Sequence, residues 1–237
     1  MRRLLAAACA PYRAVGYFHY HWARGKLGHD PMFPALLELG VFKPGQRVLD
    51  LGCGRGLLAA WFLAAERLRV EASWPAQIEV PVGLVFHGVD LHAGACGAGN
   101  QALQAQFGQR VSLTCGDMCQ AELQGFDAIT LLDVLHYISH VQQLRLLDQI
   151  GAALGPDGVL VMRVGNALGG WRFRWSYWVD LMVARAQGHH LARLFARPVA
   201  DWTQLLQARG FAVSSHSMSS GTPFANVLLV ARVASVK

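Results

Sequence analysis

Three glycines at alternate positions directly follow a short apolar run at residues 48–51: Gly52, Gly54 and Gly56. The run predicts a β-strand, and the glycines predict a tight turn onto a helix that begins near Arg55. Gly52 can adopt backbone angles closed to other residues, Gly54 has no Cβ to block a ligand near the main chain, and Gly56 allows close helix packing. The helix N-terminus also presents free N–H groups at the positive end of its dipole. We therefore expect this turn to bind a ligand.

The spacing of these glycines, together with a neighbouring acid, indicates the kind of ligand. Dinucleotide-binding turns read G-x-G-x-x-G, whereas here the third glycine comes one residue earlier and Asp50 stands two residues before the first. A carboxylate at this place disfavours a pyrophosphate and suits a ligand that carries an ammonium group. The segment DLGCGRG at residues 50–56 resembles the (D/E)-x-G-x-G-x-G motif of class I S-adenosylmethionine-dependent methyltransferases. A glycine-rich turn without a ligand is the alternative.

The resemblance implies that S-adenosylmethionine is the cofactor, and that the turn lies around its methionine portion. The residues expected there are Asp50, Gly52, Cys53, Gly54 and Gly56. Asp90 follows a predicted strand at residues 83–89, and ligands of doubly wound sheets lie outside the carboxyl ends of strands. Its carboxylate can accept two hydrogen bonds from a ribose diol, while Leu91 offers an apolar surface to adenine. Helix capping is the alternative role for Asp90.

Two further strands end in candidate cofactor-binding residues. Gly116-Asp117-Met118 follows a predicted strand at residues 110–115 and resembles the adenine-side motif of the family. The resemblance implies that Asp117 accepts a hydrogen bond from the exocyclic amine and that Met118 packs on the ring. Asp133 follows a nearly continuous apolar run at residues 126–132, as expected for a strand buried on both faces, and is also expected to bind the cofactor.

The end of that fourth strand is also where we expect catalysis. Methyl transfer from a sulfonium requires alignment, exclusion of water and, for a hydroxyl acceptor, removal of a proton. In this family an (N/D)-P-P-(Y/F) tetrapeptide here would signal methylation of an amine or a base, but residues 132–137 read LDVLHY. This favours a small-molecule acceptor. His136 is the candidate general base, because imidazole titrates near neutrality; positioning the cofactor and capping the next helix are its alternative roles.

The order of the remaining elements predicts the fold class. Residues 1–44 look helical, and helices at 57–68, 93–107, 141–154 and 199–208 alternate with strands. Two strands at 211–218 and 227–233 close the chain. This is the class I methyltransferase order: an α/β, Rossmann-like sheet of seven strands, mostly parallel, with an antiparallel last strand. We expect a helical N-terminal cap at 1–44 and a methyltransferase domain at 45–237, with an insertion at 166–198.

Two aromatic segments are candidates for binding the acceptor. In the insertion, one helical stripe contains Trp171, Trp175, Trp178 and Met182. We predict a lid in which Trp175 and Trp178 hold an aryl substrate; core packing is the alternative. Tyr20 and His21 belong to a segment at residues 17–33 that resembles the methyltransferases of aryl polyene pigment clusters, which implies a hydroxyaryl acceptor or its precursor. Segments of this kind can also pack on the sheet edge.

Composition and charge limit the partners. The 237 residues have a net charge of +6, but the basic residues are dispersed, so nucleic acid is not an expected partner. Arginines in the insertion predict contact with an acidic carrier protein or with anionic lipid: Arg172, Arg174, Arg185 and Arg193. Five cysteines without zinc-site spacing predict reduced thiols and no metal. The oligomeric state stays open.

The compartment and the competing functions complete the prediction. No run reaches the 18 apolar residues that a spanning helix needs, and residues 1–10 predict an amphipathic helix rather than a signal peptide. We expect a cytoplasmic protein, with peripheral contact to the inner membrane as an alternative. An RNA or protein methyltransferase is a competing function, although no basic domain is visible. A non-catalytic S-adenosylmethionine-binding protein is another, although Asp50 and Asp90 are both present.

Overall fold

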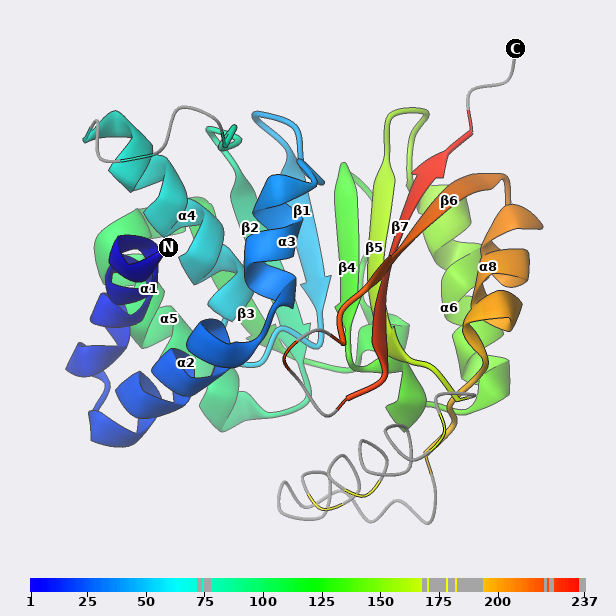
Figure 1. Ribbon diagram of the computed structural model, residues 1–237, viewed down its shortest axis with the longest axis horizontal. Helices are drawn as coiled ribbons and strands as arrows, with labels where there is room; N and C mark the ends of the chain where they lie inside the picture. Colours follow the sequence, from blue (N-terminus) through cyan, green and yellow to red (C-terminus); the bar gives the residue numbers. More distant parts are fainter. Residues whose placement is uncertain are drawn as a thin grey trace. The chain divides into compact units, whose positions relative to one another are not determined.

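The computed structural model describes residues 1–71, 74, 78–167, 170, 178, 182, 194–219, 221 and 224–234. Seven strands form a sheet of order β3-β2-β1-β4-β5-β7-β6, in which β7 is antiparallel to both of its neighbours (Figure 1). This confirms the predicted fold class. The strands are β1 (Arg47–Leu51), β2 (Val85–Asp90), β3 (Val111–Cys115), β4 (Ala128–Leu132), β5 (Val159–Gly165), β6 (Phe211–Ser217) and β7 (Asn226–Val233).

The chain divides into two compact units, Met1–Ala121 and Glu122–Lys237. In the first unit, β1, β2 and β3 pair in parallel, which aligns their carboxyl ends at one edge. α4 (Leu57–Val70) is buried over nearly all of its length, and its Phe62 ring packs 6.2 Å from Phe86 of β2. α5 (Ala93–Phe107) packs on β2 and β3. These helices therefore fix where the strand ends lie.

The N-terminal residues are helical, as predicted. They form α1 (Arg2–Cys9), the 3-10 helix η1 (Ala10–Ala14), α2 (Tyr17–His29) and α3 (Met32–Glu38). α1 packs beside α4, η1 contacts α5, and α2 packs on α1 and η1 (Figure 1). Leu4, Ala8 and Cys9 of α1 are buried, and packing of such an apolar face stabilises a helix this short.

In the second unit, β4 and β5 pair in parallel and the hairpin of β6 and β7 adds to the other side of β5. α6 (His140–Ala153) begins with a capping box, in which Ser139 accepts from the N–H of Gln142 and the Gln142 side chain accepts from the N–H of Ser139. α8 (Val199–Gln207) packs on β6. The helices and strands predicted outside the insertion at 166–198 are all present, with ends that differ by one or two residues.

Most of the insertion at 166–198 lies outside the described residues, including Trp171, Trp175 and its four arginines. Two members of the predicted stripe are described. Trp178 and Met182 are helical, and their exposed fractions are 62% and 60%. Among the described residues, no helix is long and apolar enough to cross a membrane.

Candidate functional site

The glycine turn has the backbone geometry that its sequence predicts. Gly52, Gly54 and Gly56 have φ angles of 81°, 53° and 73°, in the left-handed region that glycine adopts without strain. The N–H groups of Gly52 and Cys53 both donate to the carbonyl of Val89, at 2.7 and 3.2 Å. α4 begins directly after Gly56, at the first residue of the helix predicted for 57–68. The turn is therefore held against the end of β2.

The absence of a side chain has a different consequence at two of these glycines. A Cβ on Gly54 would meet nothing within 4 Å, so the space beside this residue is open. A Cβ on Gly56 would lie 2.9 Å from Leu103 of α5 and 3.0 Å from Leu113 of β3. Gly54 therefore leaves room for a ligand, whereas Gly56 allows the turn to pack closely against α5 and β3.

A glycine of α5, Gly99, also supports the turn, and sequence reasoning missed it. A Cβ on Gly99 would lie 2.6 Å from the carbonyl oxygen of Arg55 and 2.4 Å from Leu113. The carbonyl belongs to the backbone of the turn and cannot move without changing it. The available signal was a glycine in the middle of a predicted helix, where this residue usually has a packing reason.

Replacing Gly99 by alanine is expected to lower the free energy of unfolding by about 1–3 kcal/mol, because the added methyl overlaps the turn. The matched control is Gly97→Ala in the same helix, where a Cβ meets nothing within 4 Å. There alanine is expected to stabilise by about 0.5–1 kcal/mol, since it favours the helix. Urea denaturation measures both changes, and equal effects of the two substitutions would contradict the close contact.

Asp90 and Leu91 lie at the carboxyl end of β2, next to the turn. The carboxylate of Asp90 accepts from the N–H of Gly54 and from the N–H of His92, both at 2.8 Å. His92, rather than Asp90, caps α5. A carboxylate has about four acceptor sites, so two such bonds leave capacity for a ligand. Leu91 is 59% exposed, which leaves its apolar side chain available.

Asp50 and Asp117, the other acidic candidates of the first unit, lie near the same edge of the sheet. Asp50 is the next-to-last residue of β1 and is buried. Asp117 accepts from the N–H of Cys119 at 2.8 Å and caps the 3-10 helix η3 (Met118–Gln120). The N–H of Gly116 donates to the carbonyl of Asp90 at 3.0 Å, which links the two loops. The first unit therefore brings together the predicted residues around the glycine turn, Asp90 and Asp117.

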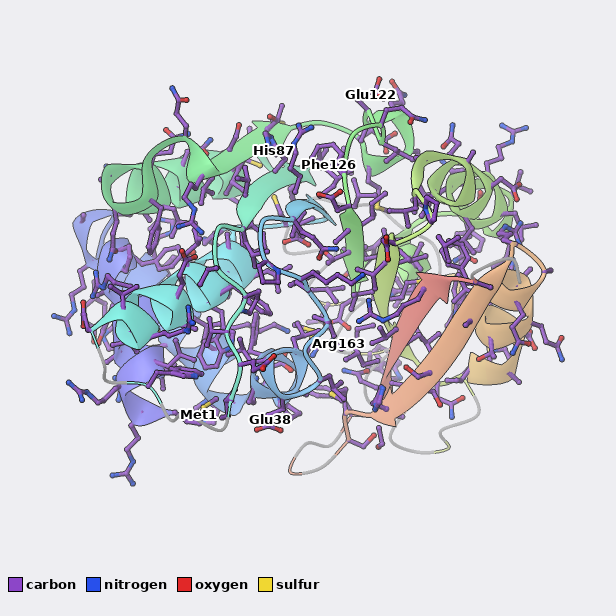
Figure 2. The ribbon with its side chains drawn as sticks, turned by 90° about the horizontal axis from the view of Figure 1, so that it is seen from above. Met1, Glu38, His87, Glu122, Phe126 and Arg163 are labelled. Carbon is purple, nitrogen blue, oxygen red and sulfur yellow. The ribbon has the colours of Figure 1, made fainter. Side chains whose placement is uncertain are left out.

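In the second unit, Asp133 at the end of β4 is held by an arginine. Its φ of 60° is the one positive value among the described non-glycine residues. Arg163, labelled in Figure 2, donates from Nε to Oδ1 at 2.7 Å and from Nη2 to Oδ2. Arg163 belongs to β5 and is 3% exposed. The carboxylate is therefore fixed in direction, and sequence reasoning missed the arginine because it lies 30 residues away.

His136 lies in a loop that buried contacts hold in place. Gln143 of α6 donates to the carbonyls of Leu135 and Phe195, at 2.8 and 2.7 Å, and the N–H of Phe195 donates to the carbonyl of His136. Burial lowers the pKa of His136 to about 4, although the nearby Asp133 carboxylate acts in the opposite direction. The expectation that this imidazole titrates near neutrality is therefore corrected. At pH 7 it is neutral and can accept a proton, but it is a weak base.

The two residues of α2 that are predicted to bind the methyl acceptor, Tyr20 and His21, contact neighbouring side chains. Tyr20 accepts from Arg13 at 3.2 Å, and the His21 ring lies 4.1 Å from that of the exposed Tyr17. Their role stays a prediction, as does that of the exposed Trp178, while Trp175 lies outside the described residues. α2 also reaches the glycine turn through His19, one of several histidines that the sequence places near the site without ranking them.

The strand order, the antiparallel last strand and the glycine turn with its acids define a class I S-adenosylmethionine-dependent methyltransferase. Residues 22–216 match a family model described as a methyltransferase domain, and the chain belongs to this family. Phosphoethanolamine N-methyltransferase 2 of Caenorhabditis elegans is 27% identical over 166 residues, 67% of this chain and 34% of the relative. The chain thus spans about a third of that curated relative.

Solved structures of methyltransferases share the fold. An O-methyltransferase family protein from Burkholderia thailandensis has a TM-score of 0.64 at 20% identity, over 91% of this chain and 58% of that one. The 1,6-didemethyltoxoflavin-N1-methyltransferase of the same organism has a TM-score of 0.63 at 21% identity, over 97% and 89%. The magnesium protoporphyrin IX methyltransferase of Synechocystis PCC 6803, with bound S-adenosylhomocysteine, has a TM-score of 0.60 at 19% identity, over 92% and 88%.

Proposed function

We propose that this protein methylates a small hydroxyaryl acceptor and that the first unit binds the cofactor through the glycine turn and Asp90. The observation that carries the proposal is the hydrogen bond from the Gly54 N–H to the Asp90 carboxylate, beside open space at Gly54. The bond fixes one carboxylate oxygen in direction, and the open space admits a ligand to the backbone. The cofactor supplies a methyl group that is already activated on a sulfonium.

The residues of the first unit fit the parts of this cofactor. Asp50 offers a buried negative charge to the ammonium group, and Asp90 offers free acceptor sites to the ribose hydroxyls. Leu91 gives an exposed apolar contact for adenine, with Asp117 and Met118 at the next loop for its amine and ring. For the second unit, we propose that Asp133 contacts the cofactor and that His136 removes the proton of the methyl acceptor.

The acceptor class rests on two kinds of support. The sequence LDVLHY at 132–137 lacks the tetrapeptide of amine and base methylation, which favours a small-molecule acceptor. Neighbours of the same fold include an N1-methyltransferase with bound 1,6-didemethyltoxoflavin and an O-methyltransferase family protein, which together support a small-molecule acceptor without favouring oxygen over nitrogen. The aryl polyene part of the proposal rests on residues 17–33 alone, and the carrier-protein partner rests on arginines outside the described residues.

Mass spectrometry of the protein with S-adenosylmethionine and a panel of phenolic acids tests the acceptor class. A gain of one methyl on a phenolic oxygen supports the proposal. Transfer to an amine such as ethanolamine phosphate, with none to any phenol, contradicts it.

Replacing Asp90 by alanine is expected to weaken S-adenosylhomocysteine binding by about ten- to a hundredfold, because hydrogen bonds to a charged group contribute about 1.5–3 kcal/mol. Titration calorimetry measures the dissociation constant. Asp90→Asn keeps one acceptor oxygen, so its affinity for S-adenosylhomocysteine should fall less than that of the alanine variant. The control is Asp201→Ala, which removes an exposed acid of α8 and should leave affinity unchanged. Wild-type affinity in a folded Asp90→Ala variant would contradict the assignment.

A further inference from the structure

Arg55 is the residue of the glycine turn at which the N-terminal helices and α5 meet. It stands between Gly54 and Gly56, and its backbone carbonyl accepts a hydrogen bond from the hydroxyl of Tyr12 in η1 at 2.8 Å. Tyr12 is fully buried. On the other side, α5 approaches the same carbonyl so closely that only a glycine fits at position 99. The peptide group of Arg55 is therefore held from two directions.

The side chain of Arg55 binds α2. Its Nε donates to Nδ1 of His19 at 3.1 Å, and an Nδ1 that accepts is unprotonated. The guanidinium carbon lies 4.3 Å from the centroid of the Trp22 ring and 5.5 Å from that of Phe18. Both distances are within the range of cation–π attraction. One turn of α2 is thus held by a single side chain.

This contact orders aromatic residues that the surrounding apolar core does not bury. Phe18 is 62% exposed and Trp22 is 36% exposed, and the guanidinium of Arg55 is a contact that both rings share. The buried residues of α2 are Ala23 and Leu27. The orientation of the aromatic side of α2 therefore depends on Arg55.

We propose that Arg55 is a positioning residue, which ties the N-terminal helices to the glycine turn so that cofactor binding and the docking of α2 depend on each other. The inference rests on the proposed function, in which the turn binds the cofactor. Because Arg55 stands between Gly54 and Gly56 in the turn, a displacement of Arg55 is transmitted directly to the backbone of both glycines. Conversely, a ligand that orders the turn also orders α2.

A double-substitution cycle tests this dependence. Arg55→Met keeps the aliphatic stem but removes the donor and the charge, and His19→Leu removes the acceptor. Each change is expected to raise the dissociation constant for S-adenosylhomocysteine about tenfold. In the double variant this dissociation constant should be at most about twentyfold above that of wild type, since both changes break the same contact. His19→Asn keeps an acceptor near the position of Nδ1 and should bind within about threefold of wild type.

The control uses a second arginine–aromatic pair, which belongs to the N-terminal helices. Arg13 donates to the hydroxyl of Tyr20 at 3.2 Å and lies 4.8 Å from its ring, but it belongs to η1 rather than to the turn. Arg13→Met should leave the dissociation constant within about twofold of wild type, and its effect should simply add to that of His19→Leu.

Hydrogen exchange of the α2 amides provides a second measurement that a merely structural role would not reproduce. In wild type, S-adenosylhomocysteine is expected to slow exchange at residues 19–23, and in Arg55→Met this protection should disappear while that of β1 is kept. Affinity within twofold of wild type in folded Arg55→Met, or unchanged protection of α2, overturns the inference alone. Failure of the wild type to bind S-adenosylhomocysteine overturns the proposed function as well. If Arg55→Met does not fold, equal affinities of His19→Leu and His19→Asn for S-adenosylhomocysteine would overturn the inference instead.

Discussion

Replacement of Asp133 by alanine is expected to lower the free energy of unfolding by about 3–5 kcal/mol. Arg163 is 3% exposed and loses its carboxylate partner, and a buried cation without that partner is costly. Alanine also fits poorly at the φ of 60° that Asp133 adopts, whereas aspartate and asparagine tolerate this region. Urea denaturation, compared with wild type at pH 7, measures the loss.

Two further variants separate the ion pair from the backbone. Asp133→Asn keeps a residue that tolerates this φ and an acceptor for Arg163. Its free energy of unfolding should therefore fall by about half as much as in the alanine variant. Combining it with Arg163→Met removes the buried cation and should recover part of that loss, because replacing both partners of a buried pair is often close to neutral. An alanine variant as stable as wild type would show that the pair does not support this loop.

Replacement of His136 by asparagine is expected to lower kcat by about 10²–10⁴-fold if the proposed general base is correct. The affinity for S-adenosylhomocysteine should stay within about threefold, because the role concerns the acceptor's proton. Asparagine keeps a polar side chain of similar size and cannot take up the proton. Turnover is measured at saturating cofactor, and an unchanged kcat in the folded variant would transfer the role to another group.

The pH profile gives an independent measurement of the same role. Burial lowers the pKa of His136 to about 4, so the imidazole is unprotonated above that pH. Turnover that depends on it should therefore show no loss between pH 8 and about pH 5, and should fall only as the pH approaches 4. An acid limb centred near 6.5, retained in the asparagine variant, would identify a different proton acceptor.

Protonation of His136 also couples to stability, with a definite sign. Its pKa is lower in the folded chain than the ordinary value of about 6.5 in the unfolded chain, so the unfolded state binds more protons between these values. The free energy of unfolding should therefore decrease as the pH falls from about 6.5 to 4. The asparagine variant should show a smaller decrease over this range, which guanidinium titrations at several pH values can compare.

The sequence by itself determined the fold class and the position of the cofactor turn. Alternate glycines after an apolar run permit few backbone paths, and the three positive φ angles occur where the pattern predicts them. The helices and strands follow from local periodicity and from breakers such as Gly155-Pro156, so their ends differ from expectation by only one or two residues. These features depend on residues that are close together in the chain.

Only the tertiary structure decided which distant groups act on those residues. Arg163 fixes Asp133 from 30 positions away, Tyr12 and His19 hold Arg55 from 43 and 36, and Gly99 is required by a carbonyl on another element. No local pattern records such contacts. Likewise, the sequence alone predicts that His136 titrates near neutral pH, as histidine usually does. Burial in the folded chain lowers its pKa to about 4. Both differences have the same physical reason: packing brings together side chains, and excludes water from them, in ways that spacing along the chain does not encode.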